Sequence, residues 1–463
     1  MFLQKWIEHQ IRETARQDAD FARLMAKRNL DAPTRDDLEA FQLFRLSRAL
    51  NHAYERSSFY GELFNRAGAK PGDIKSLADL ARLPLTDSSA LAASPYRFLC
   101  VSRGAVERAY TLSTAGTTGA AKKLFFTEKD IERISDYMGA AMKTVAMLSG
   151  MGSEGYTVFV MLPNSKPESQ AHLLARGVEK YSARPATSDL TLGSQEQIEA
   201  IARVSADIIF GSTSRIHRMT QEGRGDLARL EVKVLFATSE YLPPAMRGKM
   251  ERAWGAKVYL HYGMTEMGFG GGVECTAHHG FHFNEADFLF EVVDPESGEA
   301  LPKRREGELV FTTLGREGMP LVRYRSGDLS RLLPGPCSCG ASILERIGPL
   351  RRRVAAEALL GGGEEVYPAL FDDALYSIPG LVDYRVSLTT VGSRVGLRCH
   401  IEAAGASAQI EEEVRRALTA IPPLHRNLAS GYLTGLDIEL VPPGTLKRAG
   451  RGKQRISDLR QQA

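Results

Sequence analysis

Several features that would mark a special class of protein are missing from this sequence. No stretch approaches the roughly 18 consecutive apolar residues that a membrane-spanning helix requires. The N-terminal segment 1–20 interrupts its apolar positions with charges and lacks the continuous apolar core of a signal peptide. Five cysteines in 463 residues are too few for a disulfide framework. We therefore expect a cytoplasmic protein with reduced thiols and no membrane partner.

A strong charge of either sign is also absent. The sequence has 59 Lys and Arg against 56 Asp and Glu, a formal net charge of +3, which does not predict a nucleic-acid partner. Its 43% hydrophobic and 25% charged content is typical of an ordinary globular protein. At 463 residues the chain exceeds the size at which a single core stops growing, so two or more domains are expected.

The residue pattern changes along the chain in a way that predicts an α/β fold. Residues 1–110 read as mostly helical, whereas 108–265 alternate short β-branched runs with helical stretches, as in a sheet covered by helices. Residues 287–347 read as strands and turns. A shift in composition near 349–363 indicates a boundary. We predict a large domain of layered sheets and helices over 1–349 and a small mobile α+β domain over 350–463, with the active site in the cleft between them.

The clearest elements can be located from these runs alone. Strands are expected where apolar, β-branched residues cluster, and a helix where apolar residues recur every three or four positions. The strands are expected at 206–210, 232–237, 256–260, 383–390, 395–403 and 436–441, and the helix at 407–421.

A Ser/Thr/Gly-rich segment follows the strand candidate that ends at Leu112. Two glycines bracket two hydroxyl residues, so the backbone can turn its N–H groups towards an anion while the hydroxyls add hydrogen bonds to phosphate oxygens. The segment lacks the Walker A pattern, and the competing interpretation is an ordinary hairpin loop. The residues in question are Thr114, Ala115, Gly116, Thr117, Thr118 and Gly119.

Three further segments carry side chains suited to nucleotide chemistry. Tyr262, Gly263, Thr265 and Glu266 directly follow a strand candidate, the position at which open α/β sheets bind ligands. Their aromatic face, hydroxyl and carboxylate suit a base, a phosphate and Mg²⁺. Asp328 follows a Ser-Gly turn and could accept both hydroxyls of a ribose. Lys453 stands in a basic tail, where a lysine taken alone is more often solvated than catalytic.

Taken together and in this order, the four segments resemble the adenylate-forming superfamily of acyl-CoA ligases and peptide-synthetase adenylation domains. The phenylacetate–CoA ligase branch is the most similar, and the resemblance covers nearly the whole chain, including the stretches 57–87 and 262–329. It implies that a carboxylic acid is activated with ATP to an acyl-adenylate, with release of pyrophosphate, and then transferred to coenzyme A. It also implies Mg²⁺ as a cofactor, and a homodimer, since relatives of this branch are often dimeric.

The resemblance assigns a role to each matched segment. Residues 114–119 would form the phosphate loop. The segment from Ala237 to Glu240, which includes Ser239, would flank the adenine together with Tyr262, and Gly263 would belong to the same nucleotide site. The remaining roles fall on Thr265 for the α-phosphate, Glu266 for Mg²⁺, Asp328 for the ribose hydroxyls, Arg353 for ribose or phosphate, and Lys453 as the catalytic lysine.

Two departures from the family pattern keep alternatives open. Relatives carry acidic hinge residues after an arginine, whereas this chain has Ala355 and Ala356 after Arg353. Transfer to a carrier-protein thiol or an amine is therefore the alternative to coenzyme A. In place of the branch's aromatic-rich acyl-pocket segment this chain has residues 160–168, so an aromatic acid cannot be carried over. A non-catalytic nucleotide-binding descendant is a third interpretation, and the intact Glu266, Asp328 and Lys453 argue against it.

Cysteine and histidine gather in two segments that could share a metal ion. Cys337 and Cys339 lie in one turn, and Cys275 begins a run that includes His279 and His282. Three thiols and one imidazole can form a closed tetrahedral Zn²⁺ site. CxC is an unusual spacing, and the sequence does not show whether the two segments meet. We predict a structural zinc site with either His279 or His282 as the fourth ligand.

Overall fold

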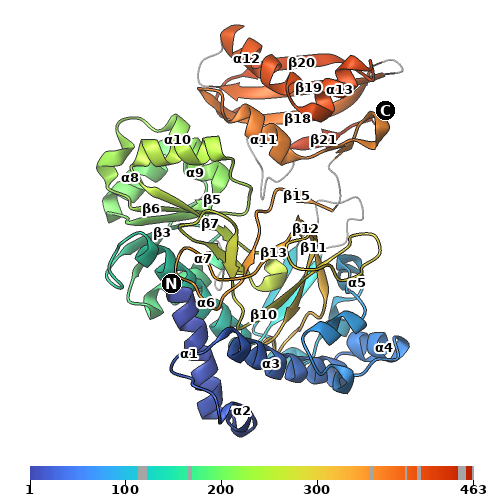
Figure 1. Ribbon diagram of the computed structural model, residues 1–463. Helices are drawn as coiled ribbons and strands as arrows, with labels where there is room; N and C mark the ends of the chain where they lie inside the picture. Colours follow the sequence, from blue (N-terminus) through green and yellow to red (C-terminus); the bar gives the residue numbers. More distant parts are fainter. Residues whose placement is uncertain are drawn as a thin grey trace. The chain divides into compact units, whose positions relative to one another are not determined.

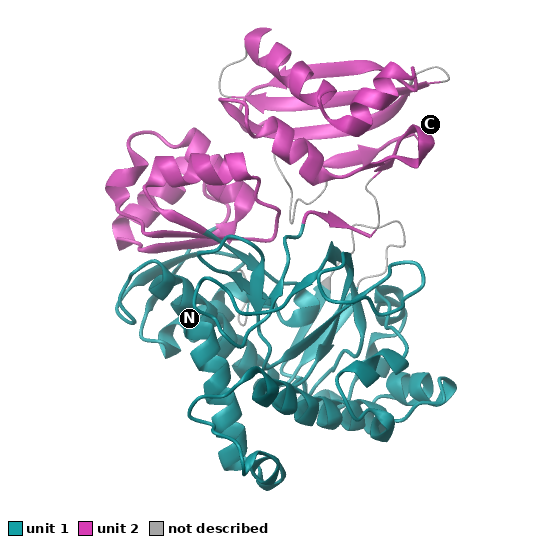
Figure 2. Ribbon diagram, in the orientation of Figure 1, with its two compact units in different colours: residues 1–189, 259–350 teal, residues 190–258, 351–463 magenta. Residues whose placement is uncertain are grey.

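The computed structural model describes residues 1–112, 122–164, 169–354, 358–391, 394–403, 408–446 and 455–460. The chain forms two compact units, each assembled from two stretches (Figure 2). The first contains Met1–Asp189 and Tyr259–Leu350, and the second contains Leu190–Val258 and Arg351–Ala463. None of the helices within the described ranges has both the length and the apolar character needed to cross a bilayer.

The N-terminal third of the first unit is helical, as predicted, and appears blue in Figure 1. Capping boxes fix the starts of two long helices: Thr34 with Asp37, and Thr127 with Asp130. In each, the hydroxyl accepts from a backbone N–H of the first turn and the carboxylate accepts from the capping residue. The helices of the whole first unit are α1 (Phe2–Gln17), α2 (Ala19–Met25), α3 (Arg35–Arg56), α4 (Ser58–Arg66), α5 (Ser88–Ala93), α6 (Glu128–Leu148) and α7 (Gln170–Lys180).

Most strands of the first unit are antiparallel and pair with a neighbour in sequence. The pairings run β1–β2, β10–β11–β12 and β13–β14–β9–β8–β7, while β3 and β4 are parallel. Strand β11 is buried along its whole length, which places it in the core. The strands are β1 (Arg108–Leu112), β2 (Lys122–Phe126), β3 (Thr157–Met161), β4 (Arg184–Thr187), β7 (Lys257–Tyr262), β8 (Gly272–Glu274), β9 (Phe281–Phe283), β10 (Phe288–Val293), β11 (Gly307–Thr313), β12 (Tyr324–Ser330), β13 (Leu332–Leu333) and β14 (Arg346–Ile347).

The second unit combines a parallel pair, β5–β6, with a four-stranded sheet in the order β20–β19–β18–β21. In that sheet β18 and β19 are antiparallel, whereas β20 and β21 join the two edges in parallel. The strands are β5 (Ile208–Ser212), β6 (Val234–Thr238), β15 (Arg352–Arg353), β16 (Ala358–Leu359), β17 (Glu365–Val366), β18 (Leu381–Val391), β19 (Arg394–Ala403), β20 (Leu433–Val441) and β21 (Ile456–Asp458). The helices are α8 (Ser194–Val204), α9 (Thr213–Glu222), α10 (Pro244–Trp254), α11 (Pro368–Leu375), α12 (Ala408–Thr419) and α13 (Pro422–Ala429).

The predicted α/β fold class is confirmed, and the expected strand runs are all strands, with end points that differ by a few residues. The helix expected at 407–421 is α12. The predicted boundary between residues 349 and 350 stays a prediction, although the second stretch of the second unit begins close to it, at Arg351.

Candidate active site

The end of β7 is shaped by a tight turn that only glycine allows. A Cβ on Gly263 would lie 2.2 Å from the carbonyl oxygen of Phe269, so any larger residue would displace the backbone. Gly268 has a φ of +77°, in the left-handed region that favours glycine. Between the two glycines a short 3₁₀ turn, Thr265–Met267, buries both Thr265 and Glu266. The sequence around Glu266 therefore fixes a carboxylate just past the end of a strand.

Glu266 has a cation and a hydroxyl as its neighbours. Its Oε1 lies 2.9 Å from Nζ of Lys122 on β2 and accepts from the Tyr324 hydroxyl at 3.3 Å. Its backbone carbonyl accepts from Nη1 of Arg316 at 2.5 Å. Burial lowers the pKa of Arg316 to about 10. Buried carboxylates that lie beside an ammonium and a guanidinium are common at functional sites, so Glu266 is a functional-site candidate.

Tyr262 and Asp328 form a direct pair. The Tyr262 hydroxyl donates to Oδ2 of Asp328 at 2.9 Å, although the two residues are 66 positions apart. The turn that presents Asp328 on β12 uses Gly327, whose φ is +76°. The Ser326 hydroxyl accepts from the Asp328 backbone N–H at 3.0 Å. The first unit thus brings together the base, ribose and Mg²⁺ candidates that the resemblance implies.

Ser239, Glu240 and Arg353 belong to the second unit. Ser239 follows β6 with a φ of 74°, a conformation that is uncommon for serine and that clusters at functional sites. Glu240 accepts from the backbone N–H of Ser214 at 3.0 Å and from its hydroxyl at 3.1 Å. Arg353 is exposed at the end of β15.

Several predicted residues lie outside the described residues. These are the phosphate-loop residues Thr114, Ala115, Gly116, Thr117, Thr118 and Gly119, the hinge pair Ala355 and Ala356, and Lys453. Their roles stay predictions.

The cysteine and histidine segments meet in the first unit. Ligand atoms of Cys275, His282, Cys337 and Cys339 all lie within 4.8 Å of one another. Cys275 Sγ is 3.7 Å from Cys337 Sγ, and Cys339 Sγ is 3.3 Å from Nε2 of His282. His282 lies on β9 opposite Arg346 of β14, and this register brings it to the turn that holds both other cysteines. The structure therefore contains a Cys₃His cluster of metal-binding type.

The same geometry decides between the two histidines left open by the sequence. His279 is exposed in the turn before β9, whereas His282 is fully buried. Nδ1 of His282 lies 3.1 Å from the backbone carbonyl of Glu345, which leaves Nε2 for the cluster. A hydrogen bond from Cys275, with a further contribution from His282, lowers the pKa of Cys339 and so favours the thiolate form that a metal binds.

Glu345 belongs to a buried network of charged side chains with Glu285 and Arg35. Its backbone N–H donates to Oε1 of Glu285 at 2.7 Å, and Arg35 pairs with both carboxylates. Burial raises the pKa of Glu285 to about 7 against the opposing charge of Arg35. The network fixes the carbonyl that orients His282.

The roles of Tyr324 and Arg316 at Glu266 were missed from the sequence. Both lie in or beside the stretch 307–329 that matched the family, but nothing in their spacing indicates that they meet Glu266. Lys122 stands just after the predicted phosphate loop, a position that favours an anion-facing cation and could have been used to predict its pairing.

No protein-family model matches the chain. Among curated proteins, the phenylacetate–coenzyme A ligase of Thermus thermophilus is 29% identical over 463 residues, covering 94% of this chain and 100% of that protein. The phenylacetate–coenzyme A ligase of Pseudomonas putida is 29% identical over 426 residues and covers 89% of this chain and 92% of that protein.

Solved structures show the same likeness. A 2-hydroxyisobutyryl-CoA ligase in a postadenylation state, with R3-HIB-AMP bound, superposes with a TM-score of 0.75 at 22% identity, over 91% of this chain and 90% of that chain. The anthranilate CoA ligase AuaEII with anthranoyl-AMP gives a TM-score of 0.51 at 14% identity, over 74% of this chain and 65% of that one.

The chain thus has the fold of the adenylate-forming CoA ligases. Its sequence is similar to those of the phenylacetate–coenzyme A ligases over most of its length, at 29% identity.

Proposed function

We propose that this chain is an AMP-forming acid–CoA ligase. In the first step an oxygen of the substrate carboxylate attacks the α-phosphorus of ATP, and the bond to pyrophosphate breaks. In the second step the thiol sulfur of coenzyme A attacks the acyl carbon, AMP leaves, and the thiol proton passes to solvent. The homology to named CoA ligases along nearly the whole chain supports both steps.

The observation that carries the proposal is the cluster at the end of β7. Glu266 is buried beside Lys122, and Tyr262 is bonded to Asp328. The residues matched to Mg²⁺, base and ribose thus lie in one unit, on β7, in the turn that follows it and on β12. Adenylation brings a carboxylate to a polyphosphate, and the charge that builds up must be neutralised. A buried carboxylate for a metal ion together with cations for phosphate answers that need.

The residues present fit Mg²⁺ as well as ATP. Both described contacts of the Glu266 carboxylate engage Oε1, so Oε2 is the oxygen we assign to the metal ion. Bound Mg²⁺ would neutralise phosphate charge. Asp328 would hold the ribose hydroxyls, with Tyr262 beside the base.

We propose in addition that Cys275, His282, Cys337 and Cys339 bind a structural Zn²⁺. Three thiols and an imidazole suit a closed tetrahedral zinc site. The carbonyl of Glu345 at Nδ1 is the kind of partner that zinc-bound histidines commonly have. The cluster joins turns of a single sheet, so the ion would hold together β8, β9 and the loop between β13 and β14.

The first test is pyrophosphate release from ATP and Mg²⁺ over a panel of aryl, fatty and dicarboxylic acids, with and without coenzyme A. We expect release that depends on one class of acid, and a CoA thioester of that acid as product. Acid-dependent release without a thioester would move the acyl group to another acceptor, such as a carrier-protein thiol. ATP binding without turnover for every acid would contradict the ligase. The cytoplasmic location and the homodimer stay predictions.

A further inference from the structure

Lys122, on β2, is paired with the buried carboxylate that we assign to Mg²⁺. Its Nζ lies 2.9 Å from Oε1 of Glu266, and the two side chains are 13% and 6% exposed. The same Nζ donates to the Tyr324 hydroxyl at 3.3 Å, and that hydroxyl donates to Oε1 of Glu266 at 3.3 Å. The ammonium, the carboxylate and the hydroxyl therefore form a closed triangle of hydrogen bonds between β2, the turn after β7 and β12.

The two neighbours of the Glu266 carboxylate respond differently to a metal ion. The Tyr324 side chain is fully buried and its hydroxyl is neutral, so it can continue to donate to Oε1 while Oε2 binds a cation. The Lys122 ammonium carries a charge of the same sign as the metal ion. Like charges a few ångströms apart repel strongly where water is excluded. A divalent cation at Oε2 therefore competes with Lys122 for the same carboxylate.

The position of Lys122 on its strand allows its ammonium to change partner. It is the first residue of β2, and its charge stands at the end of a flexible four-carbon stem. The next residue, Lys123, points to the opposite face of the strand, where its Nζ lies 5.7 Å from the centroid of the Tyr96 ring. Lys122 can thus leave Glu266 by rotation of its side chain, without any shift of the strand.

We propose that Lys122 is a positioning residue that stands in for the divalent cation at Glu266 until ATP brings the metal. Before the nucleotide binds, Lys122 neutralises a buried carboxylate whose charge is costly without a partner. The polyphosphate of ATP then compensates both cations, and Lys122 moves from Glu266 to an anionic oxygen of the nucleotide. The inference rests on the proposed function, which assigns Glu266 to Mg²⁺.

Competition for one carboxylate predicts two effects of opposite sign when Lys122 is removed. The metal alone should bind more tightly, because no like charge opposes it. ATP with Mg²⁺ should bind more weakly, because a cation that pairs with phosphate is lost. A lysine that only holds Glu266 in shape would weaken both on removal, and a lysine with no role would change neither.

The first measurement is the affinity for Mn²⁺ alone, by water-proton relaxation, in protein first saturated with zinc so that the cysteine cluster is filled. We expect K122M to bind Mn²⁺ about tenfold more tightly than wild type. K122R, which retains the charge, and K123M, on the opposite face, should match wild type. E266Q gives the background of other sites, and K122M/E266Q should fall to that background.

The second measurement is KM for ATP at saturating Mg²⁺. It should rise about tenfold in K122M, recover in part in K122R and stay at the wild-type value in K123M. If K122M does not fold, K122Q, whose amide can still donate to Glu266, serves in its place. Mn²⁺ affinity equal to or below that of wild type, or an unchanged KM for ATP, would overturn the proposal. Absence of acid-dependent pyrophosphate release in the wild type would overturn the proposed function instead, and the Mn²⁺ comparison would then decide the role of Lys122 by itself.

Discussion

In the first unit, the candidate site is held by two side-chain hydrogen bonds. Tyr262 donates to Asp328, and Tyr324 donates to Glu266. In the second unit, Glu402 and Arg455 are held by ion pairs whose partners lie 184 and 83 positions away. The first arrangement combines turns fixed by glycines with one ion pair, between Glu266 and Lys122. The second depends on charge pairs between separate stretches of chain.

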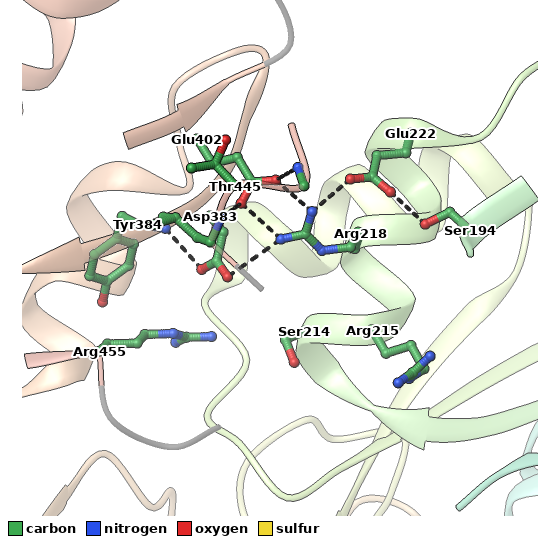
Figure 3. Close-up of polar contacts among 12 residues, drawn as sticks. Ser194, Ser214, Arg215, Arg218, Glu222, Asp383, Tyr384, Glu402, Thr445 and Arg455 are labelled. Atoms are coloured by element: carbon green, nitrogen blue, oxygen red, sulfur yellow. Dashed lines mark hydrogen bonds and ion pairs between the residues drawn. The ribbon is translucent and has the colours of Figure 1, made fainter. Parts of the chain in front are cut away.

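This difference indicates how each region responds to change. A turn fixed by Gly263 and Gly268 keeps its geometry whatever the charge state of its neighbours. Buried ion pairs lose far more when one partner is removed, because the other charge is left uncompensated. We therefore expect the pair of Tyr262 and Asp328 to tolerate the loss of a nearby charge better than the pair of Arg218 and Glu402 (Figure 3) does.

The largest effect is expected from removing the charge of Lys453. Lys453→Ala should lower pyrophosphate release about 100- to 1,000-fold, because the charge that neutralises the transition state is removed. Binding of ATP should change little, since the variant retains the residues matched to the base and the ribose, Tyr262 and Asp328. The rate is measured with the acid found in the panel. Lys447→Ala is the matched control, a lysine of the same segment that should leave the rate unchanged. Near-normal pyrophosphate release from Lys453→Ala would contradict the assignment of Lys453 as the catalytic lysine.

The metal cluster tests whether the first unit also depends on charge. Cys337→Ser should lower the affinity for zinc more than about 100-fold, because it removes a ligand. Changes to residues that only hold the ligands in place already cost about 10- to 100-fold. Elemental analysis of purified protein should give close to one zinc per chain in the wild type and almost none in the variant. Thermal unfolding should occur at a lower temperature in the variant. Cys100→Ala, a buried thiol outside the cluster, should retain the metal. A metal-free wild type after expression with added zinc would contradict the site.

More of the interacting residues of the first unit than of the second could be located from the sequence, for physical reasons. Strand ends can be recognised from apolar runs and the turns from glycines, so Tyr262 and Glu266 were found at the end of a strand. The choice between His279 and His282 required the pairing register of β9 with β14. Arg218 and Glu402 carry no local signal, because charges on a helix face and in a strand usually indicate solvated positions. Only the tertiary packing shows that they pair.

A buried histidine of the second unit, His217, should make the free energy of unfolding fall at acid pH. His217, on α9, is buried edge-on against Tyr376 with ring centroids 5.1 Å apart. Burial lowers its pKa to about 3, with a further contribution from Lys249. Because the folded-state pKa is below the unfolded value of about 6.5, its stabilisation is complete above pH 6.5 and is lost as the pH falls towards 3.

The prediction for His217→Met is a change in the pH dependence of the free energy of unfolding. Between pH 7 and pH 5 the wild type should lose about 2 kcal/mol more than the variant, since each pH unit below 6.5 is worth about 1.4 kcal/mol. Urea unfolding at the two pH values measures this difference. His9→Met, at an exposed position, is the control and should keep the wild-type slope. Parallel slopes for wild type and His217→Met would contradict a buried neutral histidine.

The smallest effect is expected where the first unit is already well fixed. Tyr262→Phe removes one hydrogen bond to Asp328 and leaves the ring, the turn and the strand in place. A bond to a charged group is worth about 1.5 kcal/mol, so KM for ATP should rise about 10-fold with kcat within about twofold. Tyr259→Phe, on the same strand, removes a hydroxyl that donates to the backbone carbonyl of Leu148 at 3.5 Å and should leave KM unchanged. A fall in kcat without a rise in KM would place Tyr262 in the chemical step, because only an interaction that strengthens in the transition state acts on kcat alone. A rise in KM alone would support its assignment to the nucleotide, as a residue that holds Asp328 ready for the ribose.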